Sequence, residues 1–148
     1  MLPYLILGGL ATWFLSTSGK KKKKRVFISF AIEDKKFRDY LVDQSRRPNS
    51  PFEFIDMSVK TNWENNIWKK RCRTKIKRCH GFIILLSKNT IKASGARWEI
   101  KCAKEENVKV IGMHIRKNET DYKIPIEIKN EKTIIWTWEN LEKFIKQL

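Results

Sequence analysis

The sequence lacks the glycine-rich motifs on which many nucleotide-binding domains depend. Its six glycines in 148 residues form neither the GxGxxG pattern of dinucleotide-binding folds nor a P-loop with its lysine. A phosphoreceiver domain needs an aspartate at the end of its third strand, but Leu86 and Ser87 stand at the corresponding position. Classical dinucleotide, P-loop and phosphoreceiver sites are therefore excluded.

Cysteine and histidine are also scarce. The three cysteines are odd in number and lack CxxC spacing, which indicates reduced thiols in a cytosolic compartment. His80 follows Cys72 and Cys79 in the chain, but no second pair of ligands accompanies them, so no metal site is expected. His114 lies within an apolar run, where a hydrogen-bonded core histidine is the plainest interpretation. Nothing suggests a Ser-His-Asp or Cys-His triad.

Acidic residues are half as numerous as basic ones. The 32 Lys and Arg against 16 Asp and Glu give a net charge of +16, and six positive charges form one run at residues 20–25. This excess predicts attraction to anions such as lipid headgroups, nucleic acid or phosphorylated small molecules. The basic stretch at residues 69–78 leaves nucleic acid open as a partner. No aromatic stacking platform or groove-reading motif supports it, so a solvated or lipid-facing surface is favoured.

Charge is absent from residues 2–18. As a helix this stretch spans about 25 Å, slightly less than a hydrocarbon core of about 30 Å, and the lysines that follow can snorkel across the difference. A cleavable signal peptide carries its positive charges before the apolar stretch, whereas here they follow it. We predict a single-pass anchor in the inner (cytoplasmic) membrane at residues 1–19 and a polybasic linker at residues 20–25. Residues 26–148 would form a cytoplasmic domain. The alternative is a buried N-terminal helix followed by a solvated charge run.

Beyond residue 25, short apolar runs of strand length alternate with stretches of helical periodicity. Strands are expected at residues 26–30, 52–56, 82–86, 108–115 and 133–136. The helix at residues 62–78 should turn inward Trp63, Ile67, Cys72 and Ile76. The alternation predicts an α/β fold with a five-stranded parallel sheet covered by helices on both faces.

In such a sheet, ligands bind at the carboxyl ends of the strands, near the point where the strand order reverses. Polar and aromatic residues follow three of the predicted strands at this edge. They are Ser29, Phe30, Ala31, Asp34, Asp56 and Ser87.

Glu99 is the most informative residue of the helix predicted to begin near Ser94, which is a candidate N-cap. On a helical wheel, its neighbours form an apolar arc of Ala96, Trp98, Ile100, Cys102 and Ala103. A carboxylate on a buried face costs several kcal/mol unless something pairs with it. Either a Lys or Arg of a neighbouring element neutralises Glu99, or the residue has a functional role.

Five segments resemble TIR domains, and more closely the TIR-like protein of the Thoeris antiphage system. Each is weak alone, but their order and spacing over about residues 25–116 are fairly specific. The segments are residues 25–30 (RVFISF) followed by Asp34, residues 54–56 (FID), 82–87 (FIILLS), 97–100 (RWEI) and 110–112 (VIG). The resemblance implies a flavodoxin-like fold, with residues 26–148 as the TIR-like domain.

The resemblance also implies an activity. Enzymatic members of this family cleave the nicotinamide–ribose bond of NAD, and some cyclise the product into a signal for a separate effector. NAD is the substrate, and no cofactor is implied. The family's catalytic glutamate matches Glu99, with Phe30 and Trp98 expected beside the nicotinamide, and Ser29 and Asp34 at the entrance. The sequence departs from many members at Gly95, where they carry tryptophan.

A second hypothesis assigns no catalysis. TIR domains commonly self-associate, and in many active ones a neighbouring copy completes the site with a loop, here residues 57–62. A membrane-tethered adaptor that acts by assembly, which raises effective concentration, would use the same surfaces.

Overall fold

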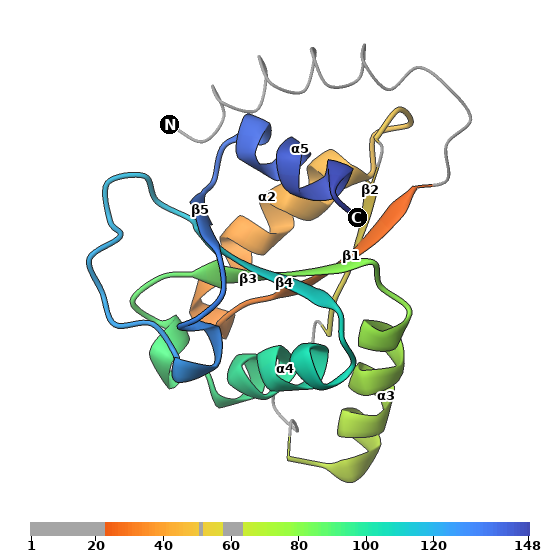
Figure 1. Ribbon diagram of the computed structural model, residues 1–148, viewed down its shortest axis with the longest axis vertical. Coiled ribbons are helices and arrows are strands. Elements are labelled where there is room, and N and C mark those ends of the chain that lie inside the picture. Colours follow the sequence, from red (N-terminus) through yellow and green to blue (C-terminus); the bar gives the residue numbers. More distant parts are fainter. Residues whose placement is uncertain (1–22, 51, 58–63) are drawn as a thin grey trace.

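The computed structural model describes residues 23–50, 52–57 and 64–148. Its centre is a parallel sheet of five strands in the order β2-β1-β3-β4-β5 (Figure 1). The strands are β1 (Lys24–Ser29), β2 (Phe52–Ile55), β3 (Gly81–Leu86), β4 (Lys109–His114) and β5 (Thr133–Ile135). The helices are α2 (Lys35–Ser45), α3 (Asn66–Lys77), α4 (Ser94–Glu105) and α5 (Trp138–Lys146), with short 3₁₀ turns at Ile32–Asp34, Thr90–Lys92 and Ile126–Ile128. The predicted α/β fold is confirmed.

The predicted anchor at residues 1–19 lies outside the described residues, as do residues 20–22 of the linker. In the part of the chain that the structure describes, none of the helices has the length and apolar character needed to cross a membrane. The end of the predicted linker is instead strand: Lys24 and Arg25 belong to β1 and pair with Phe52 and Glu53 of β2. Backbone pairing with β2 thus extends β1 into the basic run.

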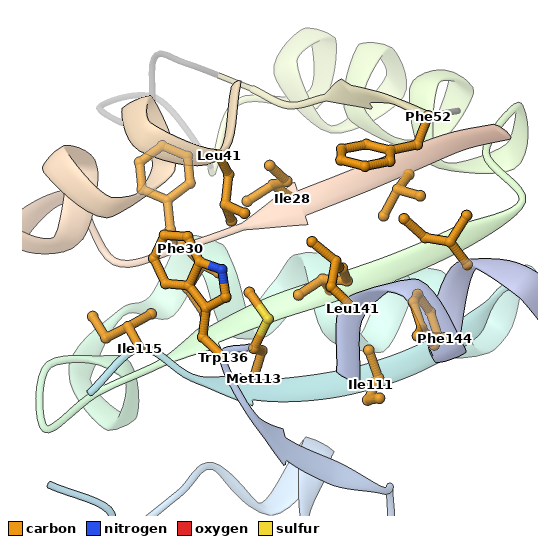
Figure 2. Close-up of a cluster of buried hydrophobic side chains, with 14 of the residues drawn as sticks. Ile28, Phe30, Leu41, Phe52, Ile111, Met113, Ile115, Trp136, Leu141 and Phe144 are labelled. Carbon is orange, nitrogen blue, oxygen red and sulfur yellow. The ribbon is translucent and has the colours of Figure 1, made fainter. Parts of the chain in front are cut away.

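Each face of the sheet has its own apolar core. Helices α2 and α5 cover one face, and α3 and α4 cover the other (Figure 1). Side chains of β1 alternate between them, because Val26 and Ile28 enter the α2/α5 core while Phe27 enters the α3/α4 core. Figure 2 shows the α2/α5 core, in which Phe30 continues the series begun by Ile28.

Helix α3 begins later than predicted, and its predicted buried face is confirmed at Cys72 and Ile76 but not at Ile67. Asn65 is its N-cap, with a side-chain oxygen that accepts from the backbone N–H groups of Ile67 and Trp68 at 2.8 and 3.3 Å. Trp68, Cys72 and Ile76, each four residues apart, form its buried stripe. The prediction for Ile67 was wrong, since this residue is 62% exposed, and Trp63 lies outside the described residues.

Helix α4 starts at Ser94 itself, so the prediction of Ser94 as its N-cap was wrong. The N-cap is Ala93, which makes no side-chain capping bond. Four of its six buried residues are small, namely Gly95, Ala96, Cys102 and Ala103. The other two are Glu99 and Ile100.

Candidate active site

Glu99 lies where α4 meets the end of β1 and the buried stripe of α3. The residue has no solvent exposure. Its Oε1 accepts a hydrogen bond from Ser29 Oγ at 2.7 Å, and its Oε2 accepts one from Cys72 Sγ at 3.6 Å. Three elements far apart in the sequence therefore supply one carboxylate and two of its hydrogen-bond donors.

The local structure explains why Ser29 reaches this carboxylate. Ser29 is the last residue of β1, and strand alternation turns its side chain, like that of Phe27, toward α4. Its hydroxyl also lies 3.3 Å from the carbonyl oxygen of Ala96, three residues before Glu99. The shorter distance to the carboxylate makes Glu99 the principal acceptor.

Trp98 lies beside Glu99 in the sequence and packs against α3. Its half-buried ring contacts Trp68 edge to face, with ring centroids 5.7 Å apart. The Arg73 guanidinium lies over the Trp98 ring, 5.7 Å from its centroid, and also pairs with Glu105 and Glu106 at 3.0 and 2.5 Å. The hydrogen bonds that Arg73 donates to Glu105 and Glu106 raise the pKa of Arg73. This cluster holds α3 against α4 beside the carboxylate.

A second polar cluster forms where β1 and β3 end. Asp34 is buried and accepts hydrogen bonds from Ser87 Oγ at 2.5 Å and from Asn89 Nδ2 at 3.0 Å. Thr90 completes it, because its hydroxyl accepts from the Ser87 backbone N–H at 2.9 Å and donates to the Leu85 carbonyl at 3.1 Å. Asp34 and Ser87, both predicted at the site, thus bond to each other.

Phe30 and Asp56 lie with α2 rather than with Glu99. Phe30 is fully buried in the α2/α5 core, with the Arg38 guanidinium 5.2 Å from its ring centroid. Arg38 Nε lies 3.3 Å from Asp56 Oδ2. Phe30 follows Ser29, and consecutive residues of an extended chain face opposite ways, so Phe30 packs into the α2/α5 core while Trp98 packs against the α3/α4 core. Their expected place beside one nicotinamide stays a prediction.

Ala31 contributes to this edge of the sheet through its main chain. It is fully buried, and its carbonyl accepts the Asp34 N–H at 2.8 Å, which closes the 3₁₀ turn after β1. This turn places the Asp34 carboxylate against Ser87. Ala31 thereby supports the second cluster through its main chain.

The hydrogen-bonded pair of His114 and Tyr122 was not predicted from the sequence. The Tyr122 hydroxyl donates to the Leu86 carbonyl at 2.8 Å and lies 2.6 Å from His114 Nδ1. Burial lowers the pKa of His114, and burial, followed by the charges of Glu119 and Asp34, raises the pKa of Tyr122. His114 is thus hydrogen-bonded as expected, although it is half-buried and not in the core. Its partner holds the segment after β4 to the carboxyl edge of the sheet.

Cys72 is the contact of Glu99 that the sequence analysis did not identify. The available signal was its four-residue spacing from Trp68 and Ile76, which marks it as buried but not as a donor. Within residues 23–50, 52–57 and 64–148, no three His, Cys, Asp or Glu side chains are grouped as a metal site. Glu99 supplies a carboxylate that is shielded from water at this edge of the sheet.

Comparisons with known proteins agree with the fold. Residues 27–120 match the family model of the Thoeris protein ThsB, TIR-like domain. The TIR domain of the Toll-related receptor TRR-2 from Hydra magnipapillata is similar, with a TM-score of 0.63, 16% identity, and coverage of 82% of this chain and 97% of that one. The CMP N-glycosidase BcmB from Clostridium botulinum is similar with a TM-score of 0.51, 20% identity, and coverage of 84% and 100%. No curated protein sequence matches.

Proposed function

The chain belongs to the family of TIR-like domains of the Thoeris protein ThsB, and on that basis we propose that it cleaves the nicotinamide–ribose bond of NAD. The product would be an ADP-ribose-type signal, linear or cyclic, for a separate effector in bacterial antiphage defence. The observation that carries the proposal is the buried Glu99 carboxylate at the carboxyl edge of the sheet, hydrogen-bonded by Ser29.

The chemistry suits such a group. Cleavage of an N-glycosidic bond develops positive charge on the ribose in an oxocarbenium-like transition state. A carboxylate in a water-excluded site stabilises that charge strongly, because its field is little screened. Nicotinamide in NAD is already a good leaving group, so no second carboxylate is required as general acid. The CMP N-glycosidase of similar fold is named for the same type of bond.

The burial of Glu99 adds a condition. Because the side chain has no solvent exposure, the ribose of NAD reaches it only after covering groups move. We infer that the described conformation is a closed state, which suits an enzyme that is silent until triggered or assembled. The predicted membrane anchor at residues 1–19 and self-association through the TIR-like domain would concentrate copies for such a step.

The adaptor hypothesis remains the second candidate, and the same burial favours it, because a carboxylate held permanently inside the protein has no substrate. The two functions differ in whether NAD is consumed. The full-length protein is incubated at high concentration with NAD, and the products are identified by mass spectrometry. An enzyme releases nicotinamide, whereas an adaptor leaves NAD intact.

Two matched substitutions on α4 test whether the activity depends on Glu99. Glu99→Gln keeps the size and a hydrogen-bond acceptor but removes the charge, so nicotinamide release should fall at least about 100-fold. Glu105→Gln, on the same helix but in an exposed pair with Arg73, should leave release within about twofold. Undiminished release by Glu99→Gln would rule out this role for the carboxylate.

A further inference from the structure

We propose that Cys72 is a positioning residue for Glu99, an inference that rests on the catalytic role proposed above for that carboxylate. The Cys72 thiol donates to Oε2 at 3.6 Å, and the Ser29 hydroxyl donates to Oε1 at 2.7 Å. The two donors come from α3 and β1 and engage different oxygens. Together they oppose rotation of the carboxylate about its terminal bond and so fix its plane relative to the sheet.

The position of Cys72 could be filled by an apolar side chain if packing were its only task. It belongs to the stripe in which Trp68 and Ile76, one turn away on either side, pack into the α3/α4 core. Cys72 differs from a small apolar residue of similar volume in one respect, the S–H group that faces Oε2. A donor beside the ionised carboxylate favours the charged form, which is the form that stabilises an oxocarbenium ion.

Cys102 provides the matched comparison within the same core. It is also fully buried, and it lies on α4 three residues after Glu99. Among the described residues, its thiol makes no hydrogen bond to the carboxylate. Burial, more than the charges of neighbouring acids, raises the pKa of Cys102 to about 11, so it packs as a neutral thiol. Loss of a buried sulfur can thus be separated from loss of a donor to Glu99.

The experiment compares Cys72→Ala, Cys72→Ser and Cys102→Ala in the full-length chain. Nicotinamide release is measured across roughly pH 5 to 9, and thermal unfolding is followed in parallel. Cys72→Ala should lower kcat about tenfold with KM nearly unchanged, and should move the acid limb of the kcat profile to higher pH. Cys72→Ser keeps a donor and should recover most of the turnover. Cys102→Ala should retain the wild-type pH profile and turnover within about twofold.

Each other outcome overturns a defined statement. Equal losses of kcat in Cys72→Ala and Cys102→Ala, with unchanged pH profiles, would mean that Cys72 only packs in the core. Release that disappears in Glu99→Gln but is unaffected in Cys72→Ala would overturn the positioning role alone. A wild-type protein that never releases nicotinamide would overturn the proposed function, and any catalytic role of Cys72 with it. If Cys72→Ala fails to fold, Cys72→Ser decides, because it must then keep most of the wild-type turnover and the wild-type pH profile, and loss of either would overturn the positioning role.

Discussion

The Ser29 hydroxyl donates a 2.7 Å hydrogen bond to Oε1 of Glu99, joining the last residue of β1 to the second turn of α4. The two residues are 70 positions apart in the chain. The bond exists because β1 ends with Ser29 on the face that α4 covers, opposite to the face that receives Phe30. Strand alternation at one position therefore decides which side chain meets the carboxylate.

Replacing Ser29 by alanine should impair both turnover and stability. The change removes a donor from a buried carboxylate, which typically costs about 1–3 kcal/mol of unfolding free energy, and kcat should fall about tenfold. Ser45→Ala is the control, since Ser45 is buried in α2 and its hydroxyl donates to the Val42 carbonyl, at 2.8 Å. Urea unfolding and nicotinamide release measure the two effects. Wild-type turnover in Ser29→Ala would contradict a role at the carboxylate.

Replacing Asp34 by alanine should destabilise the carboxyl edge of the sheet. The change leaves the hydrogen-bond donors of Ser87 and Asn89 without this buried acceptor, so a loss of about 2–4 kcal/mol is expected. Asp39→Ala removes a half-exposed carboxylate that pairs with Lys35 at 3.2 Å, and should cost about 0–1 kcal/mol. Urea unfolding compares the two variants, and equal losses would show that the Asp34 cluster contributes no special stability.

The sequence predicted the sheet, the helix that carries Glu99, and the burial of this carboxylate. These features follow from periodicity: residues 82–86 are continuously apolar, as in a strand buried on both faces, and Glu99 falls inside an apolar arc. Both are regular signals that act over several residues. Residues placed by such signals, including Ser29 and Asp34 at the ends of strands, did lie at the predicted edge.

The partners of these residues were not predictable in the same way. Whether Phe30 or Ser29 faces α4 depends on the register at the end of β1, and a shift of one residue reverses the face. Asp56 was predicted at the carboxyl edge of the sheet, and its carboxylate lies beside Arg38 of α2, because a position after a strand fixes the edge of the sheet and not the direction of a side chain.

The predicted buried face of α3 was wrong at Ile67 for a related reason. The helix has six Lys and Arg residues between Asn66 and Lys77 and few apolar ones, so Ile67 and Trp68 offer two adjacent choices for the buried face. The structure selects Trp68, which packs against Trp98. The contact with α4 therefore decides which of the two residues is buried, whereas the periodicity of the sequence favoured neither clearly.

The buried face of α3 can be tested by truncating two isoleucines of this helix. Ile76 has no solvent exposure, and Ile76→Ala should cost about 2–5 kcal/mol through lost burial and a residual cavity. Ile67 is 62% exposed, and Ile67→Ala should change stability by about 0.5 kcal/mol or less. The variants make the same substitution in the same helix, so urea unfolding isolates burial. If Ile67→Ala lost more unfolding free energy than Ile76→Ala, the helix would bury the face that carries Ile67 instead.

Stability should fall as the pH drops below about 6.5, and His114 should be one cause. Burial lowers the pKa of His114 from its ordinary 6.5. Between the folded-state pKa and 6.5 the unfolded chain therefore binds more protons, so acid favours unfolding across that window and stability recovers as pH rises through it. His114→Gln removes this titration while retaining hydrogen-bonding capacity toward Tyr122. Urea unfolding at about pH 5.5 and 7.5 should show a smaller pH dependence of the unfolding free energy in the variant than in the wild type.

A residual dependence is expected from His80, because burial, followed by the charges of Arg25 and Lys24, also lowers its pKa. His80→Gln should therefore reduce the dependence independently, whereas an identical acid loss in wild type and His114→Gln would exclude His114 as a contributor.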